Sequence, residues 1–146
     1  MKVLVDTNRI IAALIRKGTT RDILFDENFE FVTPDFTITE IKEHEDELRK
    51  KTKLTKEEFD VLLALIFEHI RIIPYEKYKM FIEKYKSEIS DQDDVPHLAA
   101  SIATKAEGIW AHDPHFLEQH KMKVFTNIDL LRFRRNDKVI SGTPKS

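Results

Sequence analysis

Two kinds of hydrophobic pattern alternate along the chain. Short apolar runs predict five strands, the last of them weak, and they cover residues 2–6, 29–33, 70–73, 109–111 and 123–126. Between these runs, apolar residues recur at helical spacing, as Ile10, Ile11, Leu14 and Ile15 do ahead of Gly18. Because parallel strands need crossover helices, the alternation predicts an α/β fold, a three-layer α/β/α sandwich around a parallel sheet of about five strands.

Residues that typically begin or end helices delimit the predicted helices. Thr55 followed by Glu58 has the spacing of a capping box and begins a helix over 57–69, whereas Pro96 suits the first turn of a helix that Gly108 ends. Two more helices are predicted over 38–51 and 76–86. No linker or repeat interrupts the pattern, so we expect one domain over 1–135 and a frayed C-terminal tail over 136–146.

Composition excludes several classes of protein. With 24 basic and 26 acidic residues among 146, the net charge of −2 does not fit a strongly basic nucleic-acid coat. There is no Cys, which excludes disulfides and thiolate zinc sites, and there is no glycine-rich nucleotide-binding loop. No apolar run reaches membrane-spanning length, so we expect a cytoplasmic protein without a signal peptide or a membrane partner.

Acidic side chains follow or precede several of the predicted strands. Ligands of open parallel sheets bind beyond the carboxyl ends of the strands, so acids from separate segments are expected to meet at that edge. The candidates are Asp6, Glu40, Asp93 or Asp94, and Asp113, with the amide of Asn8 close to Asp6.

Each acid also has a structural explanation of its own. Asp6, Asp94 and Asp113 could serve as ordinary helix caps or turn residues. Glu40 lies three residues after Thr37, and Asp93 three after Ser90, which are cap spacings. The convergence of the set, rather than any single acid, therefore favours a site.

Clustered carboxylates need compensation. Like charges a few Å apart repel by several kcal/mol at an effective dielectric of about 20, and either protonation or a divalent cation relieves that repulsion. Carboxylate and amide oxygens suit Mg²⁺ or Mn²⁺, and such ions serve the hydrolysis of phosphodiesters. The pattern therefore favours a metal-dependent hydrolase.

Three stretches together resemble the PIN-domain family, namely VDTN at 5–8, DDVPHLAASIA at 93–103 and IWAHDPHF at 109–116. The resemblance extends from Lys2 to about Phe133 and implies a PIN-like domain with Mg²⁺- or Mn²⁺-dependent endoribonuclease activity. It assigns the metal and the catalysis to Asp6, Glu40, Asp94 and Asp113, and it places Asn8 at the family's near-constant amide. Many relatives are toxins of toxin–antitoxin pairs, which implies an RNA substrate, an antitoxin partner and a homodimer.

The chain departs from the family's pattern around Asp113. Ala111 stands where many relatives carry Ser or Thr, and His115 stands where many carry another acid. These losses support an alternative hypothesis, a non-catalytic RNA-binding or scaffold relative. We favour catalysis, with Asn8, Arg9 and His115 as substrate-binding residues, because Arg9 adjoins the acids and His115, like His97, could line the mouth of the pocket as a cation.

Overall fold

The first strand lies in the middle of the molecule because its side chains are apolar on both faces. In a computed structural model, Val3, Leu4 and Val5 are all completely buried. The structure describes the backbone of residues 1–142 and the side chains of residues 1–135. A strand buried on both faces is typical of parallel sheets covered by helices on each side.

The elements follow in the alternating order predicted from the hydrophobic pattern. In chain order they are β1 (Lys2–Val5), α1 (Thr7–Ile15), α2 (Thr19–Leu24), β2 (Glu30–Pro34), α3 (Phe36–Glu43), α4 (Glu45–Thr52), α5 (Lys56–Phe67), β3 (Ile70–Ile73), α6 (Tyr75–Tyr85), α7 (Val95–Ala103), β4 (Gly108–Trp110), the 3₁₀ helix η1 (Pro114–Glu118), β5 (Lys123–Phe125) and α8 (Asn127–Gly142).

All five strands pair in parallel, in the order β3-β2-β1-β4-β5. The chain therefore builds outward from β1 in one direction through β2 and β3, and then returns to the other side of β1 with β4. Such a reversal of strand order creates a crevice at the carboxyl ends of the two central strands. The α/β sandwich with a five-stranded parallel sheet is confirmed.

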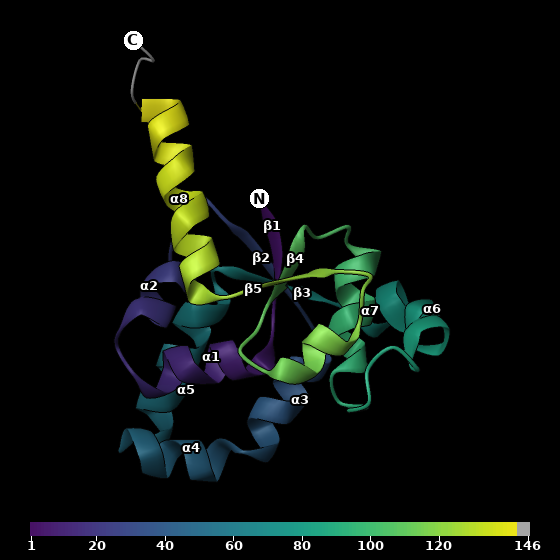
Figure 1. Ribbon diagram of the computed structural model, residues 1–146. Coiled ribbons are helices and arrows are strands. Elements are labelled where there is room, and N and C mark those ends of the chain that lie inside the picture. Colours follow the sequence, from purple (N-terminus) through teal and green to yellow (C-terminus); the bar gives the residue numbers. More distant parts are fainter. Residues whose placement is uncertain (143–146) are drawn as a thin grey trace.

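Alternate residues of the strands enter two different cores. Val3 and Val5 pack with α1, α2 and α5, whereas Leu4 packs with α6 and α7 on the opposite face. Figure 1 shows these helices on the two sides of the sheet, with α8 projecting away from the other elements. The strand that carries the first candidate acid is thus held from both faces and by both neighbouring strands.

A close approach between backbone and ring fixes β4 against β5. Gly108 begins β4, and a Cβ added at this residue would come within 2.4 Å of the Phe125 ring. The sequence predicted Gly108 as the end of a helix, but α7 ends at Ala103 and Lys105 takes a left-handed conformation with φ of 56°. Here glycine is required by packing rather than by helix termination.

Two other differences concern the helices. The helix predicted over 38–51 is broken at His44, and the new helix α4 begins with Glu45, Asp46 and Glu47 in its first turn, where the helix dipole favours negative charge. Helix α8 continues to Gly142, past residue 135, where the sequence placed the end of the domain. Residues 143–146 of the predicted tail lie outside the described residues. Within the described chain, no helix is long and apolar enough to span a bilayer.

Candidate metal centre

Asp6 is the buried end of the central strand. Its backbone nitrogen donates to Trp110 O at 3.0 Å, which extends the β1–β4 pairing by one residue, and its side chain lies at the carboxyl edge of the sheet. Only 2% of Asp6 is exposed, and the carboxylate does not cap α1. Among the described residues, its Oδ2 atom has no hydrogen-bond partner.

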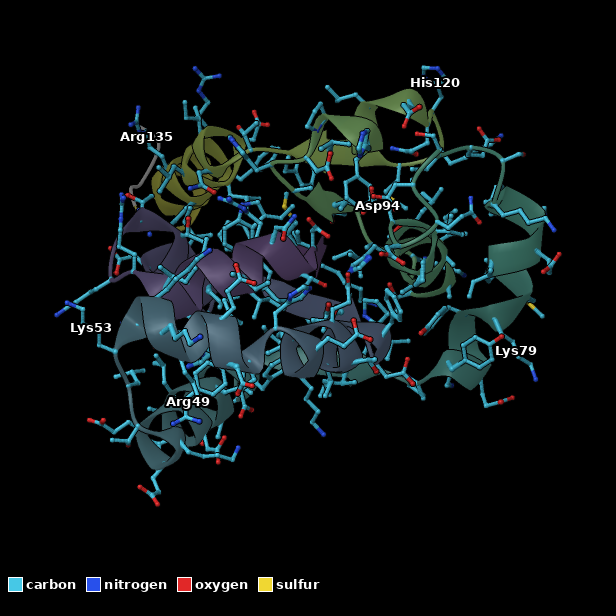
Figure 2. All side chains as sticks on the ribbon, turned by 90° about the horizontal axis from the view of Figure 1, so that it is seen from below. Arg49, Lys53, Lys79, Asp94, His120 and Arg135 are labelled. Atoms are coloured by element: carbon cyan, nitrogen blue, oxygen red, sulfur yellow. The ribbon has the colours of Figure 1, made fainter. Side chains whose placement is uncertain are left out.

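Asp94 brings a second buried carboxylate to the same place. It precedes α7, is 7% exposed and makes no side-chain cap, and its Oδ2 atom also has no partner among the described residues. Figure 2 looks from below onto this side of the sheet, and Asp94 lies near the middle of the view. The neighbouring Asp93 is exposed, so the geometry favours Asp94 of the two predicted alternatives.

Burial and mutual repulsion make ionisation of these acids costly. Loss of solvent, with the Asp113 charge adding to it, raises the pKa of Asp6 to about 7. The pKa of Asp94 is also raised to about 7, first by burial and then by the charges of Asp6 and Asp113. Two buried carboxylates that disfavour their own charge are suited to a compensating cation.

Glu40 reaches the site from α3 and is held by the first turn of α1. Thr7 Oγ1 donates to Glu40 Oε1 at 2.6 Å, and this hydrogen bond replaces the capping role that the Thr37 spacing had suggested. The buried His97 lies between the acids, with Nε2 at 3.6 Å from both Asp6 Oδ1 and Glu40 Oε1. Burial raises the pKa of Glu40, while His97 and Thr7 oppose that shift.

Asp113 follows β4, and the imidazole of His115 lies between it and Asp94. Its Oδ1 atom accepts a hydrogen bond from the backbone nitrogen of His115 at 2.9 Å, so Asp113 caps η1. This agrees with the structural explanation of Asp113 as a cap or turn residue. The exposed His115 Nδ1 lies 3.2 Å from Asp113 Oδ1 and 3.8 Å from Asp94 Oδ2. The cap and a place at the site are therefore compatible.

The donor atoms form a set that fits a metal ion. One oxygen each of Asp6 and Asp94, together with a ring nitrogen of His97, lie within 4.8 Å of one another. The unpartnered Oδ2 atoms of the two aspartates are buried and available as hard ligands. A divalent cation at this point would satisfy two buried oxygens that accept no hydrogen bond from the described residues.

Comparison with known proteins agrees with this arrangement. The family model described as PIN domain matches residues 4–128, which include all four candidate acids. The chain belongs to the PIN-domain family. No curated protein matches this PIN domain by sequence.

A solved structure has the same fold. A chain in the crystal structure of VapBC2 from Rickettsia felis, bound to a DNA fragment from their promoter, aligns with a TM-score of 0.68 over 86% of this PIN domain and 98% of that chain. The sequences are 15% identical, so the likeness shows a common fold and nothing finer.

The predicted substrate-binding residues lie around this centre rather than in it. Asn8 is exposed, and Arg9 is half-buried with its Nη1 atom donating to Thr20 Oγ1 at 3.4 Å. Arg9 lines a groove of about 670 Å³ between α1, α2 and the start of α8, together with Arg16 and Asn127. His115 approaches the carboxylates of Asp94 and Asp113 directly.

Sequence reasoning placed His97 at the mouth of this PIN domain's pocket and did not single out the threonines near it. The structure places His97 at the floor, 1% exposed, against Thr7 and Thr37. A signal was present, because His97 lies among the apolar positions of the α7 inner face and needs polar partners there. Ala111, which lacks the hydroxyl of many relatives, is buried at the end of β4.

Proposed function

We propose that this PIN domain is a divalent-metal-dependent endoribonuclease. Asp6, Glu40, Asp94 and Asp113 would hold one or two Mg²⁺ or Mn²⁺ ions at the carboxyl edge of the sheet. The observation that carries the proposal is the pair of buried carboxylates of Asp6 and Asp94, each with an oxygen that no described residue satisfies.

The chemistry is divided between the cation and the chain. When bound, a divalent cation polarises a phosphodiester and lowers the pKa of an attacking water. Asp6 and Asp94 provide the fixed negative charge that binds the cation, and Thr7 holds Glu40 in place with its 2.6 Å hydrogen bond. No side chain of this site is placed as a nucleophile, and the acids act by position and charge.

The groove beside the acids offers a path for the RNA strand. Arg9 and Arg16 contribute positive charge to its wall, and Thr19, Thr20 and Asn127 contribute polar groups. Asn127 Nδ2 donates to Thr20 Oγ1 at 3.1 Å, which keeps this wall in one arrangement. Phosphates lying along the groove would approach the carboxylates past Arg9, and His115 lies beside Asp94 and Asp113.

Cleavage of a labelled RNA panel with added Mg²⁺ or Mn²⁺ tests the proposal. We expect products from the wild-type protein, their loss on chelation with EDTA, and at least a 100-fold lower rate for Asp6→Asn. Asp46→Asn, which changes an exposed acid on α4, is the matched control and should cleave normally. Identical products from wild type and Asp6→Asn would favour the alternative, a non-catalytic RNA-binding relative, to which Ala111 and His115 point.

The VapBC2 likeness supports a further part of the proposal, a protein partner in a toxin–antitoxin pair. An antitoxin that inserts a basic group between Asp6 and Asp94 would neutralise the same buried charge as the metal. In that case production of the wild-type chain should arrest growth, production of Asp6→Asn should not, and the partner should bind the wild type more tightly than the variant. A homodimer remains part of the proposal, and sedimentation measures it directly.

A further inference from the structure

We propose that His97 is a metal ligand, so that the centre binds a borderline transition ion such as Mn²⁺ in preference to Mg²⁺. The inference rests on the proposed function and specifies its cation. Its starting point is that a ring nitrogen of His97 and one oxygen each of Asp6 and Asp94 lie within 4.8 Å of one another, all in buried residues, and that Nε2 is the nitrogen 3.6 Å from Asp6 Oδ1. Nitrogen from imidazole suits transition ions, whereas Mg²⁺ prefers oxygen alone.

The other ring nitrogen fixes which atom of His97 carries the lone pair. Nδ1 lies 3.3 Å from the backbone oxygen of Asp93. A carbonyl only accepts, so this contact requires the proton on Nδ1 and leaves the lone pair of a neutral ring on Nε2. Histidine ligands of metals are commonly oriented in this way, by donating their second N–H to a backbone carbonyl or a carboxylate.

The hydroxyl groups around Nε2 have their protons directed elsewhere. Thr33 Oγ1 donates to Val5 O at 2.9 Å, which leaves Thr37 to donate across its 2.8 Å contact with Thr33. Thr7 in turn donates to Glu40 at 2.6 Å. In this arrangement the single protons of Thr7 and Thr37 are both used within the hydroxyl network, although both oxygens lie near the imidazole nitrogen.

The imidazole Nε2 therefore faces only electron pairs. Thr7 Oγ1 lies 2.9 Å away, Thr37 Oγ1 lies 3.2 Å away, and a carboxylate oxygen of Asp6 lies at 3.6 Å. A metal ion bound to Nε2 would occupy this position among the oxygen atoms and would also satisfy the unpartnered Oδ2 atoms of Asp6 and Asp94.

The ring is also rigidly placed, as a ligand must be. Phe36 and Phe116 both make edge-on contacts with it, with ring centroids 6.4 and 6.3 Å away, and His97 is 1% exposed. Its position is thus fixed by aromatic packing as well as by Asp93.

Electron spin echo measurements on Mn²⁺-loaded protein test the assignment, because a coordinated imidazole gives nitrogen modulation. We expect ¹⁴N modulation in the wild type, its loss in His97→Gln, and its retention in His115→Gln and in the exposed control His120→Gln. Calorimetric titration should show that His97→Gln reduces the preference for Mn²⁺ over Mg²⁺ by about tenfold or more. Figure 2 shows His120 at the outer edge of the molecule, well apart from Asp94.

A second measurement avoids dependence on the folding of His97→Gln. In His115→Gln protein grown with ¹⁵N-histidine, the modulation should change from the ¹⁴N to the ¹⁵N pattern, and the metal-free protein should show an Nδ1–H histidine in ¹⁵N spectra. Mn²⁺ bound without histidine modulation would overturn this inference and leave the nuclease proposal standing. Absence of Mn²⁺ and Mg²⁺ binding altogether would overturn both.

Discussion

Thr7 and Glu40, which are separated by 33 positions in the sequence, are joined by a 2.6 Å hydrogen bond between Oγ1 and Oε1. Thr7 is the first residue of α1 and is buried, whereas the Glu40 side chain is 22% exposed. The hydroxyl therefore ties a partly exposed carboxylate to the buried end of the central strand. Orientation of a ligand by such a partner is what makes a metal site selective and tight.

We expect Thr7→Val to slow metal-dependent RNA cleavage by about tenfold or more, because Glu40 loses its only hydroxyl donor among the described residues. Thr7→Ser keeps the hydroxyl and should retain most of the activity. Rates measured at saturating Mn²⁺ and at low Mn²⁺ would separate weaker metal binding from slower chemistry. Equal losses in the Val and Ser variants would contradict an orienting role for this hydroxyl.

The raised pKa of Asp6 predicts how stability depends on pH in the metal-free protein. The folded-state pKa is about 7 against an ordinary value of 3.8, so between these pH values the folded state binds more protons than the unfolded state. The free energy of unfolding should therefore fall as pH rises from about 4 to about 7, by up to about 1.4 kcal/mol per pH unit for this group. Asp94, whose pKa is shifted in the same direction, adds to the trend.

Urea unfolding in EDTA at pH 5 and pH 8 measures this dependence. Asp6→Asn should reduce the loss of stability between the two pH values and should be more stable than wild type at pH 8, since the amide carries no charge to bury. Asp46→Asn should follow the wild-type curve. A wild-type protein that gains stability between pH 5 and pH 8 would contradict the assignment.

Asp35 lies at the same edge of the sheet, but unlike Asp6 and Asp94 it accepts hydrogen bonds at both carboxylate oxygens. Tyr78 OH donates to Asp35 Oδ1 at 2.5 Å, and the backbone nitrogen of Tyr75 donates to Asp35 Oδ2 at 3.0 Å. Burial and the Asp35 charge raise the pKa of Tyr78, so the phenol remains a donor. We expect Tyr78→Phe to lower the free energy of unfolding by about 2 kcal/mol while cleavage of RNA by the folded protein is unchanged. A matched loss of activity would place Asp35 in the site.

The packing of Gly108 predicts a sharp effect of a single methyl group. Gly108→Ala places a Cβ against the Phe125 ring, which must move because the added atom would lie 2.4 Å from it. The free energy of unfolding should fall by about 1–3 kcal/mol, as for other overpacked sites. Glu107→Ala, at the exposed neighbouring position, is the control for thermal melting. Gly108→Ala melting at the wild-type temperature would show that this contact is readily relieved.

Arg9 provides a test of the proposed RNA path. Arg9 is half-buried and lines the groove, where its positive charge can attract a phosphate. We expect Arg9→Gln to weaken RNA binding and to reduce the slope of log affinity against log salt by about one. Arg71→Gln, on the far edge strand β3, should bind RNA as the wild type does. Fluorescence anisotropy at several salt concentrations measures both slopes.

The meeting of the acids was accessible from sequence because it depends on topology alone. Asp6 and Asp113 follow strands that apolar runs predict, and the carboxyl-end rule applies to any parallel sheet. The choice between Asp93 and Asp94 was not accessible, because it depends on the exact rotation of α7 against the sheet. That rotation is set by packing of its buried face, which includes Leu98, against α6 and the strands.

The hydrogen-bonded threonines and His97 beneath the acids could not be predicted from the sequence, because their contacts also depend on how the helices pack. Thr7, Thr33, Thr37 and His97 come from four elements and become partners only when those elements pack. The break at His44 was also missed, since hydrophobic spacing continues through it and only the local backbone changes. The spacing of hydrophobic residues predicts helices, strands and their buried faces. It does not predict hydrogen bonds between hydroxyl groups, which depend on distances in the folded protein.

The pairing of β4 with β1 has a consequence for the newborn chain. Leu4 pairs with Ile109 across more than two thirds of the sequence, and Asp113 lies beyond that strand. A polypeptide still emerging from the ribosome has Asp6 early but cannot bring Asp113 beside it until β4 has been synthesised. The proposed ribonuclease would therefore stay inactive until β4 has been made and has paired with β1.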